Sequence, residues 1–258
     1  MNKIFIVIYF FLVSIASGSA VQYSGIYICR LLPPVTRPLA WPIPGDLKKQ
    51  ITSTTKGACI GNSTVAKYKG GEAVASLLFS AEEIALGYSC YSLAVPGHTI
   101  NQQLNAWNGF AEKKQMDWII VEIGLNDLDP SDPTGSALDR YQKLIDTINL
   151  TKKAGARVIL ATMTPCKERL VDIYKDKWKV SYNKWREMNY AIMGNHRKNI
   201  IMGVDFRFNG HTMALNDGNG NLKSVYETSR NDHIHENTAG RMIIASYWRL
   251  ALSANNLL

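Results

Sequence analysis

Short apolar runs alternate with longer amphipathic stretches from residue 57 to the end of the chain. Runs of four to eight mostly apolar residues, bounded by Gly, Pro or polar clusters, predict buried strands. Five segments have this character: GACI (57–60), YSCYSLAV (88–95), DWIIVEI (117–123), ARVILAT (156–162) and NIIMGVDF (199–206).

The segments between these runs have the spacing of helices. In residues 100–113, for example, Ile100, Leu104 and Trp107 fall on one helical face. Further helices are predicted at 136–153, at 180–198 and after Asn237, and residues 64–85 are expected to form a loop that enters a helix.

Alternation of strands and helices indicates βαβ units. It predicts a three-layer α/β/α sandwich with a central five-stranded parallel sheet, covered by helices on both faces. Sites in such sheets form beyond the carboxyl ends of the strands. Ser63, Gly97 and Asn126 follow the first three predicted strands, so they are the first candidates for chemistry.

Residues 1–20 resemble a secretory leader. Asn2 and Lys3 precede the apolar run IFIVIYFFLVSIA, and the small residues SGSA end the segment at Ala20. The alternative is a retained membrane anchor, but the run is shorter than the roughly 20 residues that span a bilayer. We therefore expect a secreted or periplasmic protein with no stable membrane insertion after cleavage.

Residues 21–56 form a second region, because LLPPVTRPLAWPIPG contains five of the nine prolines. Proline fixes φ and lacks an N–H, so this region is expected to be an extended strap. Residues 57–258 would then form one domain with a substantial core.

The remaining composition narrows the chemistry only slightly. The formal net charge is +8, but no dense Lys/Arg tract or nucleic-acid motif is present, so we expect a dispersed basic surface and no nucleic-acid partner. Cys29, Cys59, Cys90 and Cys166 match no zinc pattern, and both disulfides and free thiols remain open.

Four motifs carry candidate chemistry, and each has a structural alternative. Ser63 in IGNSTV offers a hydroxyl at a strand-to-helix turn, although Asn-Ser-Thr is also a helix cap or a glycosylation acceptor. Gly97 in VPGHT offers an N–H to an oxyanion, or simply ends a strand, while His98 is more typical of a loop residue than of a base. Asn126 in GLNDL offers a side-chain amide, or shapes a turn.

The fourth motif, DHIHENTAG (232–240), precedes the last helix. Asp232 and His235 are three residues apart, so the carboxylate can orient the imidazole as a serine hydrolase requires, with His233 pointing elsewhere. A metal site is disfavoured because no third cluster of ligands is present. We therefore expect no metal and no cofactor.

Taken in order, GNS (61–63), Gly97, GLND (124–127) and DHIH (232–235) resemble the motifs of the SGNH hydrolases, also called the GDSL family. The resemblance spans residues 57 to about 252 and implies a flavodoxin-like fold. It also implies that the first two strands are adjacent in the sheet, so Cys59 and Cys90 are expected to be neighbouring but unbonded, because cross-strand geometry in a central parallel sheet seldom suits the bond. It implies Ser63 as nucleophile, His235 as base and Asp232 as the acid that orients it. The oxyanion hole would comprise Ser63 N–H, Gly97 N–H and the Asn126 side chain. One departure is Asn62, where the family usually has Asp, and it puts full activity in doubt.

The resemblance implies a secreted serine esterase that works through an acyl-Ser63 intermediate. Because many secreted members remove acetyl groups from glycans, an O-acetyl esterase acting on a carbohydrate is the first expectation. A lipid or small-ester hydrolase and a non-catalytic glycan-binding protein are the alternatives. Trp107, Trp178 and Trp185 offer rings that stack on sugars, or core residues.

Overall fold

The structure is a computed structural model, and it describes residues 55–195, 197–206, 215, 217, 221–228 and 232–258. The predicted leader (1–20) and nearly all of the predicted strap (21–56) lie outside the described residues. Lys56, which was assigned to the strap, is in fact the first residue of a strand. Among the described residues, no helix combines the length and the apolar character needed to cross a bilayer.

Five parallel strands form one sheet in the order β2-β1-β3-β4-β5. This is the strand order of flavodoxin-like folds, and the predicted fold class is therefore confirmed. The strands are β1 (Lys56–Gly61), β2 (Ser89–Ser92), β3 (Trp118–Glu122), β4 (Arg157–Ala161) and β5 (Ile200–Val204).

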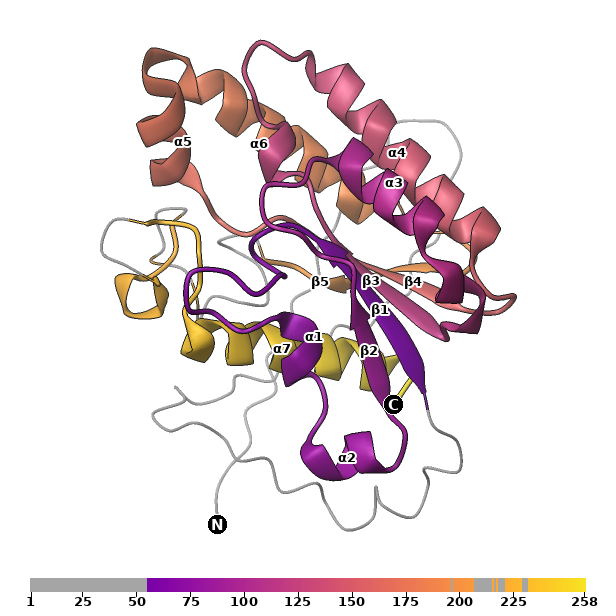
Figure 1. The fold of residues 1–258 in the computed structure, drawn as a ribbon. Helices are drawn as coiled ribbons and strands as arrows, with labels where there is room; N and C mark the ends of the chain where they lie inside the picture. Colours follow the sequence, from indigo (N-terminus) through magenta and orange to yellow (C-terminus); the bar gives the residue numbers. More distant parts are fainter. Residues whose placement is uncertain (1–54, 196, 207–214, 216, 218–220, 229–231) are drawn as a thin grey trace, which may run out of the picture. The chain divides into compact units, whose positions relative to one another are not determined.

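Helices cover both faces of the sheet (Figure 1). The helices are α1 (Val74–Leu77), α2 (Ala81–Ala85), α3 (Ile100–Gly109), α4 (Thr134–Thr151), α5 (Lys167–Tyr174), α6 (Trp178–Gly194) and α7 (Thr238–Ala254). Helices α3, α4 and α6 lie over one face, and α1 and α7 lie over the other.

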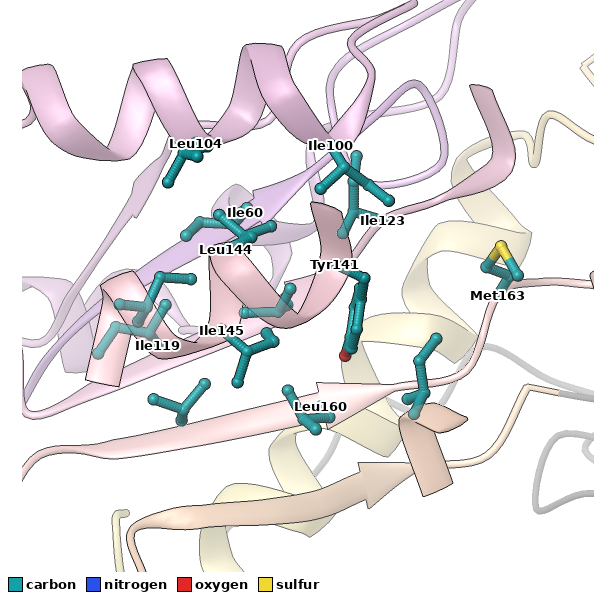
Figure 2. Close-up of a cluster of buried hydrophobic side chains, with 14 of the residues drawn as sticks. Ile60, Ile100, Leu104, Ile119, Ile123, Tyr141, Leu144, Ile145, Leu160 and Met163 are labelled. Atoms are coloured by element: carbon teal, nitrogen blue, oxygen red, sulfur yellow. The ribbon is translucent and has the colours of Figure 1, made fainter. Parts of the chain in front are cut away.

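The alternation of side chains along β3 divides the core between these two faces. Ile119 and Val121 point toward α3, α4 and α6, whereas Trp118 and Ile120 point toward α1 and α7. All four side chains are fully buried, as expected for a strand covered on both sides. Figure 2 shows the first cluster, in which Tyr141 and Leu144 of α4 pack over the strands.

Several boundaries differ from the predicted ones. The segment 64–85 forms two short helices rather than one, because Ser80 begins α2 with a reciprocal cap to Glu83. Helix α6 ends at Gly194, four residues before the predicted end, since glycine favours termination. Helix α5 was not predicted, because its eight residues are too few for a helical period to be recognised in the sequence.

Cys59 and Cys90 lie side by side on β1 and β2, as predicted. Their sulfur atoms are 3.2 Å apart, and both residues are free thiols. Cys90 pairs in register with Gly57, two positions before Cys59, so the two side chains meet diagonally across the strands. Cys166 is also a free thiol, and Cys29 lies outside the described residues.

Candidate active site

The first three predicted site residues emerge from three neighbouring strands. Gly61 ends β1 and pairs with Glu122 at the end of β3. The N–H of Val95, beyond β2, donates to the Gly61 carbonyl at 3.3 Å and extends the ladder on the other side. Ser63, Gly97 and Asn126 follow within four residues of these paired positions, so all three lie at one edge of the sheet.

Ser63 lies in a single tight turn rather than at the start of a helix. The carbonyl of Asn62 accepts hydrogen bonds from the N–H groups of Val65 (3.1 Å) and Ala66 (2.9 Å), but the next helix begins only at Val74. The predicted strand-to-helix turn is therefore corrected to a strand-to-turn junction. A helix dipole does not contribute here, because one turn lacks the aligned peptides that create it.

Ser63, His235 and Asp232 converge, although 172 residues separate the first from the second. Ser63 Oγ lies 2.9 Å from His235 Nε2, and His235 Nδ1 lies 2.5 Å from Asp232 Oδ1. The His235 backbone N–H also donates to Asp232 Oδ1 at 3.0 Å, which fixes the loop around the acid. The two contacts of the imidazole assign the proton to Nδ1 and leave the Nε2 lone pair facing the serine hydroxyl.

The surroundings keep the imidazole neutral and the carboxylate charged. Burial lowers the pKa of His235 below its usual value, and the opposing influence of Asp232 does not reverse this. Burial alone would raise the pKa of Asp232, but hydrogen bonds from Lys69 and from the His235 N–H outweigh it and lower the pKa. A neutral imidazole beside a charged carboxylate is the protonation state that a general base requires.

The groups predicted to form an oxyanion hole border this serine turn. Within the described residues, the backbone N–H groups of Ser63 and Gly97 have no protein acceptor. Gly97 has a φ of +78°, a turn conformation that other residues rarely adopt. The Asn126 side chain donates to the His98 carbonyl at 2.9 Å, which leaves its second N–H free and ties the Gly97 loop to the end of β3.

Beneath the serine turn, Asn62 is part of a buried polar group. Its Oδ1 accepts from the Thr64 N–H at 3.0 Å and lies 2.9 Å from Thr64 Oγ1, which is also 3.0 Å from Glu122 Oε1. Thr64 has one hydroxyl proton, so both of its contacts are hydrogen bonds only if Glu122 is protonated. Burial raises the pKa of Glu122 to about 8, in agreement. Asn62 itself is buried, which makes it inaccessible as a glycosylation acceptor in the folded chain.

Sequence reasoning missed two cations that hold this site together. Arg241 is fully buried and donates to the carbonyls of Ser63 and Ala66 and to the carboxylate of Glu236. Lys69 Nζ donates to Asp232 Oδ2 at 2.8 Å. Arg241 falls on the apolar face of the last helix, three positions before Ile244, and that placement was the available signal.

The remaining candidates lie outside the reacting group. His233 points away from Ser63, as predicted, and its Nδ1 lies 2.9 Å from Glu168 of α5. His98 Nδ1 contacts Gln103 and stabilises its own loop. Trp107 and Trp185 are buried in the core and therefore present no ring to a sugar, whereas Trp178 is half-buried. Within the described part of the chain, no three His, Cys, Asp or Glu side chains gather as metal ligands.

The fold is similar to those of several solved structures. The chain resembles a lipase/acylhydrolase from Enterococcus faecalis (17% identity, 78% of this chain and 97% of that chain covered, TM-score 0.55). It also resembles a psychrotrophic esterase from Pseudoalteromonas (15%, 78% and 98%, TM-score 0.52) and an acetyl xylan esterase (15%, 76% and 99%, TM-score 0.54). At these identities the likeness shows the fold alone.

No curated protein matches the chain in sequence. A family model does match, over residues 59–241, and its description is the GDSL-like lipase/acylhydrolase family. The match includes Ser63, Gly97, Asn126, Asp232 and His235, the five residues that the sequence motifs singled out. The chain therefore belongs to the GDSL-like lipase/acylhydrolase family of carboxylic ester hydrolases.

Proposed function

We propose that the protein is a metal-independent serine esterase in which Ser63 is the nucleophile, His235 the general base and Asp232 the acid that orients His235. The observation that carries the proposal is the 2.9 Å contact of Ser63 Oγ with an imidazole whose other nitrogen lies 2.5 Å from a carboxylate. A nucleophile, a base and an orienting acid within hydrogen-bond reach are the requirements for covalent acyl transfer.

The reaction begins when His235 Nε2 takes the Ser63 hydroxyl proton and Oγ attacks the acyl carbon of the ester. The carbonyl oxygen becomes an oxyanion, which Ser63 N–H, Gly97 N–H and Asn126 Nδ2 stabilise by hydrogen bonding. Collapse of the intermediate breaks the ester C–O bond, and the alcohol leaves with the proton from Nε2. Asp232 stays ionised and stabilises the imidazolium that forms in between.

Water then enters and gives a proton to His235 as its oxygen attacks the acyl-Ser63 carbonyl. The second intermediate collapses, Ser63 Oγ leaves with the proton from Nε2, and the carboxylic acid is released. Each half of the cycle returns His235 to its neutral form, so no metal or cofactor enters the balance of atoms and charge.

For the substrate, we propose an O-acetyl group on a carbohydrate outside the cell. The leader-like residues 1–20 favour export, and the formal net charge of +8 favours association with acidic glycans. One structural relative is an acetyl xylan esterase, which supports the proposal for this chain only by analogy of fold. A lipid or small-ester hydrolase is the competing substrate class.

Hydrolysis of p-nitrophenyl acetate by the wild type and by Ser63→Ala tests the mechanism. We expect Ser63→Ala to lower kcat by roughly a thousandfold or more while the melting temperature is retained. Ser253→Ala, which removes an exposed hydroxyl from α7, is the matched control and should retain full activity. A wild-type protein that is folded yet inactive on all esters would instead support a non-catalytic glycan-binding role.

A substrate panel tests the second half of the proposal. Acetate release from acetylated xylan and other acetylated glycans is compared with hydrolysis of p-nitrophenyl butyrate and octanoate. Higher kcat/KM on acetylated glycans than on octanoate is the expected result. A preference for the longer acyl chains would assign the protein to lipid or small-ester hydrolysis.

A further inference from the structure

Residues 67–72 form a tight hairpin beside the serine turn, and we call it the Lys69 hairpin. Tyr68 and Gly71 exchange backbone hydrogen bonds of 3.1 and 2.9 Å, and the two residues between them have positive φ, +48° for Lys69 and +86° for Gly70. Glycine or asparagine is the usual residue at the first of these positions, so lysine is conformationally unfavourable here. Such local strain is typical of residues retained for function.

The hairpin is docked against the loop that carries His235. A Cβ at Gly71 would overlap the Glu236 carbonyl oxygen, so the two backbones approach closely. Thr238 Oγ1 donates to the Gly70 carbonyl at 3.1 Å, and the Tyr68 ring lies 4.7 Å from the His235 ring. Buried Arg241 donates to the Glu72 carbonyl at 3.3 Å, at the base of the hairpin. These contacts fix the hairpin relative to the proposed base.

At the tip of the hairpin, Lys69 reaches the carboxylate behind the imidazole. Its Nζ lies 2.8 Å from Asp232 Oδ2, while Asp232 Oδ1 accepts from His235. The Asp232 side chain is only 3% exposed, whereas the Lys69 side chain is 43% exposed. The two carboxylate oxygens are thus held from opposite directions, which restricts rotation of the carboxylate.

We propose that Lys69 is a positioning residue of the esterase, whose ammonium group fixes Asp232 and thereby completes a Lys69–Asp232–His235–Ser63 chain of hydrogen bonds. The inference rests on the proposed function of Ser63 and His235. Lys69 does not touch the reacting atoms, so it acts through the orientation of the carboxylate and through its charge.

The charge of Lys69 has a defined effect on the base. The charged groups that act on His235 are Asp232 from its own loop, Lys69 from the hairpin and Arg169 from α5. After burial, which lowers the His235 pKa most, Asp232 raises it and the two cations lower it. Lys69 therefore keeps His235 neutral to lower pH and extends the acidic range of a reaction that needs the neutral imidazole.

The test is the pH profile of kcat/KM for p-nitrophenyl acetate. In Lys69→Met, the acidic limb should move to higher pH, because the imidazole loses a nearby cation, and kcat should fall about tenfold through the less restricted carboxylate. Lys69→Arg should restore the wild-type limb. Lys69→Gly, which relieves the positive φ of residue 69 but also removes the ammonium group, should still show the shifted limb.

Lys67→Met is the matched control, because Lys67 lies in the same hairpin and pairs with Glu72 at 3.1 Å, away from Asp232. It removes the same charge and should leave the limb and kcat unchanged. A wild-type limb in Lys69→Met, or an equal shift in Lys67→Met, would overturn the proposal in favour of a general surface-charge effect.

An NMR titration of the His235 imidazole in the full chain separates this inference from the proposed function. The resonance is assigned by its loss in His235→Gln. A higher His235 pKa in Lys69→Met than in the wild type supports the role of Lys69, and an unchanged pKa overturns it. If the wild type is inactive but the His235 pKa is still higher in Lys69→Met, the esterase mechanism is overturned. The electrostatic coupling between Lys69 and His235 is then retained.

Discussion

Glu122 is a buried carboxyl group under the serine turn, and its protonation couples folding to pH. Its pKa of about 8 exceeds the value of 4.5 expected for the unfolded chain. A group whose pKa is raised by folding contributes its full stability below the unfolded pKa, and that stability is lost as pH rises through the folded pKa. Rising pH therefore lowers the free energy of unfolding through Glu122 across a window from about pH 4.5 to about pH 8.

Glu122→Gln replaces the protonated acid by a neutral group that still donates to Thr64. Across this window, we expect the free energy of unfolding to decline less steeply with pH in the variant than in the wild type. The binding of one proton by the folded state changes the free energy of unfolding by up to about 1.4 kcal/mol per pH unit. Urea denaturation at pH 5 and pH 8.5 measures the difference. Equal slopes for wild type and variant would show that Glu122 is ionised at neutral pH.

Asn126 has two tasks under the proposed mechanism: one N–H donates to the His98 carbonyl, and the other is proposed to donate to the oxyanion. Loss of an exposed hydrogen bond costs about 1 kcal/mol, or a few degrees in melting temperature for a domain of this size. Loss of an oxyanion donor lowers kcat by about a hundred- to a thousandfold. Asn126→Ala should therefore remain folded with a much reduced kcat and a nearly unchanged KM.

Steady-state kinetics beside a thermal melt decide between this role and a purely structural one. Asn105→Ala is the control, because Asn105 is an exposed asparagine on α3 outside the site. An Asn126→Ala variant with normal kcat and a lowered melting temperature would assign the residue to the turn alone.

Between elements, α7 is joined to the serine turn by Arg241. The guanidinium is buried and has acceptors on three segments: the serine turn, the base of the Lys69 hairpin and Glu236. Burial raises the pKa of Glu236 to about 7, and the charge of Arg241 opposes this rise. Arg241 thus holds together the two halves of the site, which come from opposite ends of the domain's sequence.

Arg241→Met should lower the free energy of unfolding by about 3–5 kcal/mol, because it leaves a buried carboxylate and several carbonyls without a donor. Adding Glu236→Gln removes the uncompensated charge, so the double variant should recover part of this loss. Urea denaturation of both variants tests the cycle. A single variant within about 1 kcal/mol of the wild type would show that the buried pair adds nothing to stability.

The same elements show how far local patterns predict structure. Strands β1, β3, β4 and β5 were predicted from short, mostly apolar runs, which burial between two layers of helices requires. The edge strand β2 has a more polar sequence and is partly exposed, and it was predicted from the longer run YSCYSLAV that contains it. Helix α5 lacked such a signal, since it is only eight residues long and too short for a helical period to be recognised in the sequence. The Lys69 hairpin was predicted as a loop because Lys-Gly-Gly is a turn signal. Such a signal does not indicate which other segment of the chain the turn will contact.

At the scale of the whole molecule, the sheet order brings residues that are distant in sequence to one edge. Strand β1 lies between β2 and β3, so the loops after these three strands are neighbours, and the Asp232–His235 loop, which precedes α7, reaches the same edge. Because all neighbouring strands are parallel, this arrangement places the carboxyl ends of the five strands at one edge. It explains why four weak motifs become specific when they occur in the expected order.

The sequence by itself determined the fold class, the family and the five residues of the proposed reacting group. These depend on local composition, which indicates the buried segments, and on the order of the motifs along the chain, which places each motif after a particular strand. Only the tertiary structure decided the contacts of Lys69 with Asp232 and of Arg241 with the serine turn, and the burial of Trp107 and Trp185. The physical reason is distance along the chain, because each of these two cations contacts a residue more than 160 positions away. Local periodicity depends on neighbouring residues only, so it does not indicate which distant residue a side chain will contact.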